Sequence, residues 1–135
     1  MTQSGSVRDL HTMLAQMEPV LHREPYRFLG LPGEDADAGW VDSPFAMIRE
    51  DEGVTYIVAA EMDTGGQGHF ARITLQVKSS LQGVGLTAAV ASGLANEGIA
   101  CNVVAAFNHD HLFVPWPRGH EALRILNSLS KDARR

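Results

Sequence analysis

The sequence predicts an α+β fold, with a mostly antiparallel sheet and helices on one face of that sheet. The first observation is a strand-like run at residues 70–77, which leads through a glycine-bearing loop into a helix. The second is that two further strand-like runs and a helix follow in order, at residues 99–106, 111–115 and 119–131. The third is that a helical segment and three short strand-like runs precede them. Strands and helices mixed without regular alternation are typical of this class.

The N-terminal helix is expected over residues 7–21, where apolar side chains recur at helical spacing. These apolar positions are Val7, Leu10, Met13, Leu14, Met17 and Leu21. Ser6 is available as the N-cap, and Pro19 lies near the end of the segment. A short strand is expected to follow at residues 26–31.

Residues 45–49 and 54–60 read as two strands joined at 50–53, where Asp, Glu and Gly are typical of a hairpin turn. The segments 34–43 and 63–68 are rich in small, acidic or glycine residues, so we expect both to be loops. The first half therefore contributes a helix, a strand and a hairpin.

The central helix is expected over residues 86–96, because its large apolar side chains recur every fourth residue. These are Leu86, Val90 and Leu94, with Ala88, Ala91 and Ala95 beside them. Small side chains on this surface, together with Gly93, allow the helix to approach a sheet closely.

From residue 70 onward the order is β-α-β-β-α, which lacks the last strand of a ferredoxin-like unit. The N-terminal segment supplies α-β, the missing ending moved to the front of the chain. We therefore expect a ferredoxin-like fold of about six strands and three helices. In this interpretation an incomplete N-terminal half, residues 1–62, and a C-terminal half, residues 69–135, interleave as one compact domain.

Composition narrows the possible partners. The chain has 135 residues and a formal net charge of −5, and no cluster of Lys and Arg could neutralise a run of phosphates. Cys101 is the only cysteine, so a disulfide scaffold is excluded. No run approaches the roughly 20 apolar residues of a membrane span. We expect a cytoplasmic protein without a nucleic-acid or membrane partner.

Four segments of the second half carry a resemblance to a known family. They are 84–85 at the start of the helix, the string 94–99 (LANEGI), the string 109–114 (HDHLFV), and Ala122-Leu123 in the last helix. This part resembles the ACT domain, the regulatory module of enzymes such as aspartate kinase. The whole chain is similar to a family of small bacterial proteins built from two ACT-like units, of uncharacterised function. That similarity rests on 49–55 (REDEGVT), 77–81 (VKSSL), 84–90 (VGLTAAV) and 101–105 (CNVVA).

The resemblance implies a fold of ACT type and non-catalytic binding of a small effector, an amino acid or a similar molecule. The protein would act as a stand-alone sensor or a regulatory subunit. ACT-like units commonly pair side by side, which implies a homodimer. The alternative is a ligand-free ACT-like module that only dimerises or contacts a partner protein.

The loop before the central helix is the first candidate site. A helix N-terminus presents free N–H groups to an anion, here from Val84, Gly85 and Leu86, with Ser79 or Ser80 adding a hydroxyl. In ACT domains effector carboxylates sit on this loop. The alternative is a tight turn with serine caps that needs Gly only for its backbone geometry.

Two further residues join this candidate site. In the arginine- and lysine-sensing ACT domains an Asp at a comparable strand start contacts the cationic part of the ligand, which implies that role for Asp110. The alternative is an Asx turn over residues 108–110. Asn102 would lie on the strand next to the loop, where its amide can bind a ligand or a neighbouring polar group in the sheet.

Other chemistry finds little support in the sequence. His109 and His111 lie two apart on one strand face, but two ligands are too few for a metal site, and no cofactor motif is present. The acidic run 50–52 is typical of a solvated turn. We therefore expect no metal, no cofactor and no enzymatic activity. Trp40 and Trp116 are expected to be apolar anchors at bends of the chain, where a subunit contact can form.

Overall fold

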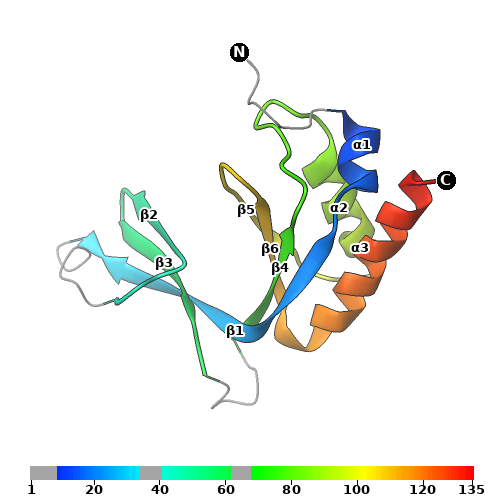
Figure 1. Ribbon diagram of the computed structural model, residues 1–135. Coiled ribbons are helices and arrows are strands. Elements are labelled where there is room, and N and C mark those ends of the chain that lie inside the picture. The colour runs from blue at the N-terminus through cyan, green and yellow to red at the C-terminus, as the bar shows by residue number, and fades with distance from the viewer. Residues whose placement is uncertain (1–8, 34–40, 62–67) are drawn as a thin grey trace.

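The computed structural model describes residues 9–33, 41–61 and 68–135 (Figure 1). Within these ranges six strands form one sheet in the order β2-β3-β1-β4-β6-β5, and neighbouring strands are antiparallel. The strands are β1 (Pro19–Pro32), β2 (Ala46–Glu50), β3 (Gly53–Ala59), β4 (Phe70–Leu75), β5 (Asn102–Ala105) and β6 (Asp110–Pro115). The helices are α1 (Leu10–Ala15), α2 (Leu86–Ala95), the 3-10 turn η2 (Trp116–Arg118) and α3 (Gly119–Ala133).

The predicted α+β class and the completion of the second half by the N-terminal segment are confirmed. Strand β1 pairs with β4 in an antiparallel ladder, in the position that the last strand of a ferredoxin-like unit occupies. On its other side β1 pairs with β3, from Tyr26 opposite Ala59 to Pro32 opposite Gly53. One strand therefore carries hydrogen bonds to both halves of the chain.

The start of the chain differs from the expectation. Helix α1 ends at Ala15, and Val20 and Leu21, expected at the end of the helix, belong to β1. The reason is that Glu18 adopts a φ of +45° and Pro19 cannot continue a helix. The side chain of Asp9 caps α1 by accepting a hydrogen bond from Thr12 N at 2.8 Å. Ser6, expected as the cap, and Trp40 lie outside the described residues.

Two strand ends in the second half also differ from the sequence expectation, because the backbone groups there form hydrogen bonds outside the sheet. Strand β4 ends at Leu75 because the N–H groups of Gln76 and Val77 donate to the carbonyl of Met17, at 2.9 and 3.3 Å. Strand β5 begins at Asn102 instead of residue 99. The N–H of Ile99 donates to Leu94 O at 3.0 Å and so closes the end of α2.

The main core lies between the helices and one face of the sheet. Figure 1 shows the helices together on this side, while β2 and β3 extend away from them. The largest side chains with almost no exposed surface in this core are Met13, Met17, Ile73, Leu75, Leu94, Leu112 and Leu126. Helix α3 contacts both other helices as well as strands β1, β4 and β6. None of the helices in the described ranges is long and apolar enough to cross a bilayer.

The opposite face of the sheet carries an aromatic cluster. The ring centroids of Tyr26, Phe45 and Phe113 lie 5.7–5.8 Å from one another in edge-to-face arrangements. Phe45 directly precedes edge strand β2, whereas Phe113 belongs to β6, which lies next to the opposite edge strand, β5. The sheet must therefore curl on this side, so that segments with three strands between them in the sheet come into contact.

Candidate functional site

The loop between β4 and α2 ends in an uncapped helix N-terminus. Gly85 precedes α2 with a φ of +105°, a conformation that glycine adopts without strain, and no described side chain caps the helix. The N–H groups of the first helical turn have no acceptor within the helix. Among the described residues the N–H groups of Val84 and Gly85 have no acceptor either. Several N–H groups at this end of α2 thus remain available to a ligand.

Helix α1 lies against this loop. A Cβ added to Gly85 would lie 3.0 Å from Cδ2 of Leu10, and one added to Gly83 would lie 3.2 Å from Sδ of Met13. Both α1 side chains therefore already pack close to the loop backbone. Nothing local in residues 10–15 indicates that contact, so α1 was not among the elements expected at the site.

Asp110 faces the same region from the start of β6. It is 9% exposed, and its carboxylate Oδ2 accepts a hydrogen bond from the Ser79 hydroxyl at 3.3 Å. Burial raises the pKa of Asp110, and the hydrogen bond from Ser79 and the nearby His109 act in the opposite direction. Asp110 is therefore a buried carboxylate with one long hydrogen bond, and a cationic partner would stabilise it.

A cavity of about 550 Å³ brings these groups together. Six of the seven predicted site residues line it: Ser79, Ser80, Val84, Gly85, Leu86 and Asp110. Met13 and Thr87 also line the cavity, and neither was expected there from the sequence. We refer to this space as the loop cavity.

Asn102 is the predicted residue that the structure does not bring to the loop cavity. Asn102 pairs with Phe113, whereas Ala105, which lines the cavity, pairs with Asp110. Because side chains alternate along a strand, Asn102 lies on the opposite face of the sheet. Its Nδ2 donates to the carbonyl of Phe113 at 3.4 Å.

Ser80 and Ser79 play different roles in the loop. Ser80 Oγ accepts from Gln82 N at 3.1 Å, and the carbonyl of Ser80 accepts from Gly83 N at 2.9 Å. Ser80 therefore holds the turn, as the alternative interpretation of the loop expected. Ser79 instead contacts the carboxylate of Asp110.

A polar chain of four residues crosses the other face of the sheet. Arg72 Nη2 donates to His22 Nδ1 at 3.1 Å, which leaves the proton of a neutral His22 ring on Nε2. His22 Nε2 then donates to Thr74 Oγ1 at 2.8 Å, and Thr74 Oγ1 donates to His111 Nδ1 at 2.9 Å. We call Arg72, His22, Thr74 and His111 the histidine chain.

The histidine chain lies beside the aromatic cluster. The Arg72 guanidinium carbon is 4.3 Å from the ring centroid of Phe45 and 5.0 Å from that of Tyr26. Burial first, and then the charge of Arg72, lowers the pKa of His111 from 6.5 to about 4. The same two causes lower the pKa of His22.

The two histidines considered as metal ligands do not form such a site with their described neighbours. His111 is held by Thr74, and the Nδ1 atom of His109 is buried without a partner among the described residues. Within those residues no group of three or more His, Cys, Asp or Glu side chains is arranged to hold a metal ion.

Comparison with known proteins gives matches in both halves. Residues 5–63 and residues 71–128 each match the ACT domain family. A solved structure of a protein of unknown function from Vibrio cholerae, described as a possible transport protein, is 38% identical. It aligns over 90% of this chain and 95% of that chain with a TM-score of 0.75.

Two more distant structures share the fold. A protein from Agrobacterium tumefaciens is 20% identical over 85% of this chain and 90% of that chain, with a TM-score of 0.66. The regulatory subunit of aspartate kinase from Thermus flavus is 12% identical over 82% of this chain and 95% of that chain, with a TM-score of 0.55. No curated protein matched the sequence.

Proposed function

Because this chain belongs to the ACT domain family, we propose that it binds a small amino-acid-like effector without catalysis. ACT domains are regulatory modules that generally bind small amino-acid ligands. The observation that carries the proposal is that the uncapped N-terminus of α2 and the carboxylate of Asp110 line one cavity of about 550 Å³. The protein would act as a stand-alone sensor or as a regulatory subunit.

The loop cavity offers complementary partners to the two charges of an amino acid. The effector's carboxylate accepts hydrogen bonds from the N–H groups of Val84, Gly85 and Leu86, where the helix dipole also favours an anion. The effector's ammonium group donates to Asp110, which has only the long hydrogen bond from Ser79. The pairing removes the cost of an otherwise unpaired buried carboxylate.

The remaining predicted residues have different parts in this proposal. Ser79 orients the carboxylate of Asp110, and Ser80 keeps the turn in shape. Asn102 is left out because it lies on the other face of the sheet. The apolar part of the effector contacts Met13 of α1 and Ala91 of α2, which also line the loop cavity.

The test is a thermal-shift screen of the parent chain against the twenty amino acids, each beside its 2-oxo acid where one is available. An effector at 100 times its dissociation constant adds about 2.7 kcal/mol to the free energy of unfolding. Removal of the ammonium group should abolish most of the shift. Titration calorimetry on the best amino acid then gives its affinity for the variants.

Two variants locate the site. Gly85→Val should abolish binding, because a β-branched residue is strained at a φ of +105° and would fill the approach to the N–H groups. Gly98→Val is its matched control, since Gly98 also has a positive φ, +72°, but lies beyond the other end of α2. Asp110→Asn should lower the affinity for an amino acid by about 10-fold or more, the range for a hydrogen bond to a charged group. If both site variants bind like the parent, the effector lies elsewhere.

The second candidate function is a ligand-free interaction module, and exposed apolar side chains beside the loop cavity favour it. Leu81 is 62% exposed, Val84 81% and Phe107 67%. In Figure 1 the loop after β4 and the β5–β6 turn lie at the same end of the molecule. A homodimer formed through this surface would cover these side chains.

Light scattering, combined with the thermal-shift screen, distinguishes between the two candidate functions. A dimer that no amino acid stabilises against heat supports the interaction module. A single monomeric species at micromolar concentration rejects the homodimer. Leu81→Ser with Val84→Ser should dissociate a dimer held by this surface, whereas Phe28→Ser changes an exposed aromatic residue on strand β1, outside this surface, and serves as the control.

A further inference from the structure

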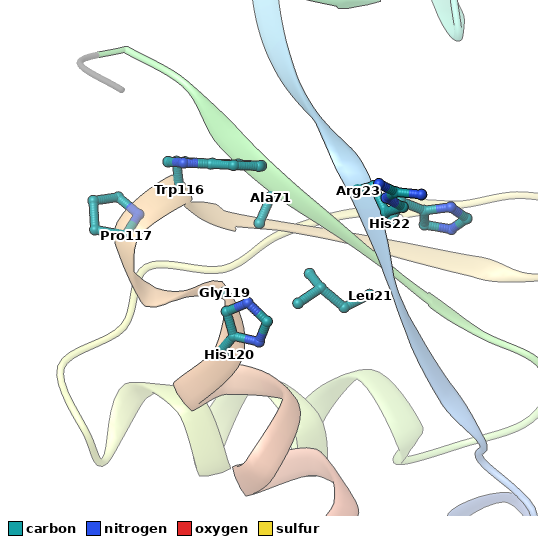
Figure 2. A pocket seen from close by; sticks show the side chains of 8 residues that line it. All are labelled: Leu21, His22, Arg23, Ala71, Trp116, Pro117, Gly119 and His120. Atoms are coloured by element: carbon teal, nitrogen blue, oxygen red, sulfur yellow. The ribbon is translucent and has the colours of Figure 1, made fainter. Parts of the chain in front are cut away.

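A second cavity, of about 490 Å³, lies beside β1 and the turn into α3 (Figure 2). It is distinct from the loop cavity, because Asp110 opens β6 and Trp116 follows its last residue. Six residues of extended strand span roughly 20 Å, so the two cavities lie near opposite ends of β6.

An irregularity in β1 accounts for the hollow. Leu21 pairs with Ile73 and Pro25 with Ala71, so three residues of β1 lie opposite the single residue Arg72 of β4. Such bulges bend a strand and redirect its side chains, and they are frequent next to functional sites. Here the bulge includes His22 and Arg23, which line the cavity.

Small residues bring the opposite wall close to the sheet. A Cβ added to Gly119 would lie 2.9 Å from the Cβ of Ala71, so the first turn of α3 rests directly on β4 at this point. Figure 2 shows Ala71 and Leu21 around the centre of the hollow, the Trp116 ring along one side and the His120 ring on the opposite side. The inner walls are therefore mostly apolar, with one large aromatic surface.

The ionisable groups at this cavity are all basic. Arg23 and His120 are exposed, and neither forms an ion pair with another described residue. His22 already contacts Arg72 and Thr74. None of the described residues that line the cavity is acidic. Glu24, which follows Arg23, accepts a hydrogen bond from the Tyr26 hydroxyl at 2.9 Å and does not line it.

We propose that this cavity is a second ligand site, which takes a small organic anion with an aromatic or branched apolar body. The apolar body packs against Trp116 and Leu21, and the anionic group is held by Arg23, which Figure 2 shows next to His22 on β1. The chain as a whole has a net charge of −5, whereas the ionisable groups at this cavity are basic. An anionic ligand is therefore attracted to this cavity in preference to the rest of the surface. A cavity of this size, apolar inside with few polar groups, suits a small molecule.

Phenylacetate is the probe, and phenylacetamide is its neutral match. Trp40→Phe leaves Trp116 as the only tryptophan, so its fluorescence reports on this cavity. Phenylacetate should change the emission saturably, and phenylacetamide should bind about 10-fold or more weakly, as expected for loss of a charged hydrogen bond. Inorganic phosphate, which lacks the apolar body, should cause no saturable change. Thermal shift of the parent chain repeats the comparison without the background substitution.

Variants test whether the probe binds in this cavity and through Arg23. Arg23→Gln should lower the affinity for phenylacetate about 10-fold or more. Arg27→Gln, at another exposed arginine of β1, should leave that affinity unchanged. Gly85→Val should also leave it unchanged, since the loop cavity is separate. The proposal is overturned if phenylacetate does not bind, if phenylacetamide binds equally well, or if Arg23→Gln has no effect. Loss of binding in Gly85→Val alone assigns the probe to the loop cavity and equally overturns it.

Discussion

Acidification should destabilise this protein through His111, and substitution of that residue should remove part of the effect. Within the fold the ring is half-buried and accepts a hydrogen bond from Thr74, with its nearest charged and titratable neighbours Arg72, His22 and His109. Burial and the charge of Arg72 lower the pKa of His111 from 6.5 to about 4. The unfolded chain thus binds a proton between these values that the folded chain does not. The contribution of His111 to the free energy of unfolding is therefore fully present above pH 6.5, and it is lost as the pH drops toward 4.

The size of the effect follows from the two pKa values. If solvent screening is ignored, the difference between pKa values of 6.5 and about 4 lowers the free energy of unfolding by about 2.5 kcal/mol between pH 7.5 and pH 4.5. The His111 ring is only half-buried, and solvent screening reduces the interaction, so we expect about 1–1.5 kcal/mol. For a chain of this length that corresponds to roughly 3–6 °C in melting temperature.

The assay is urea unfolding at a series of pH values between 7.5 and 4.5 for the parent and for His111→Gln. Glutamine does not titrate, and its carbonyl can still accept the Thr74 hydroxyl, so the variant should lose less stability on acidification by the amount given above. His11→Gln, at an exposed site on α1, is the control and should follow the parent. If His111→Gln has the same pH dependence as the parent, the burial of His111 does not control the acid response.

Two further substitutions test the packing and the hairpin. Leu126→Ala should cost about 2–5 kcal/mol in urea unfolding, because its fully buried side chain would leave a cavity under α3, and Leu123→Ala, which is only partly buried, should cost less. Gly53→Ala should cost about 1–3 kcal/mol or more, since its φ is +154° and the added Cβ would lie 2.0 Å from the carbonyl oxygen of Leu31. Gly30→Ala, which has no atom within 4 Å of the added Cβ, should be tolerated; equal losses at the two glycines would refute the steric argument.

Much of the second half could be predicted from sequence because its signals are local. The helix predicted over residues 86–96 is α2, Leu86–Ala95, and its repeat Leu86, Val90 and Leu94 is buried. The turn that precedes it needs a positive φ, which Gly85 supplies. In the first half, the hairpin between β2 and β3 also turns at the predicted Asp-Glu-Gly segment.

The sequence could not predict where strands begin and end, or on which face of the sheet a side chain lies. Both depend on pairing and packing with segments that are distant in the sequence. The 14 residues of β1 are extended because β3 pairs with one of its edges and β4 with the other. The side of the sheet on which Asn102 lies depends on where β5 begins, and a shift of one residue reverses that side. The contact of Met13 with the predicted loop likewise arises from the packing of α1, about 70 residues earlier in the chain.

The sequence by itself determined the α+β class, the helix that follows the glycine loop and six residues of the loop cavity. These features rest on periodicity and backbone conformation, which neighbouring residues specify. Only the tertiary structure decided which side chains meet across the sheet. The histidine chain joins His22, Thr74 and His111 from three strands, across 52 and 37 residues of sequence. The second cavity depends in the same way on a bulge opposite Arg72 and on α3 resting against β4. Strand register and helix packing set such contacts, and no short stretch of sequence contains them.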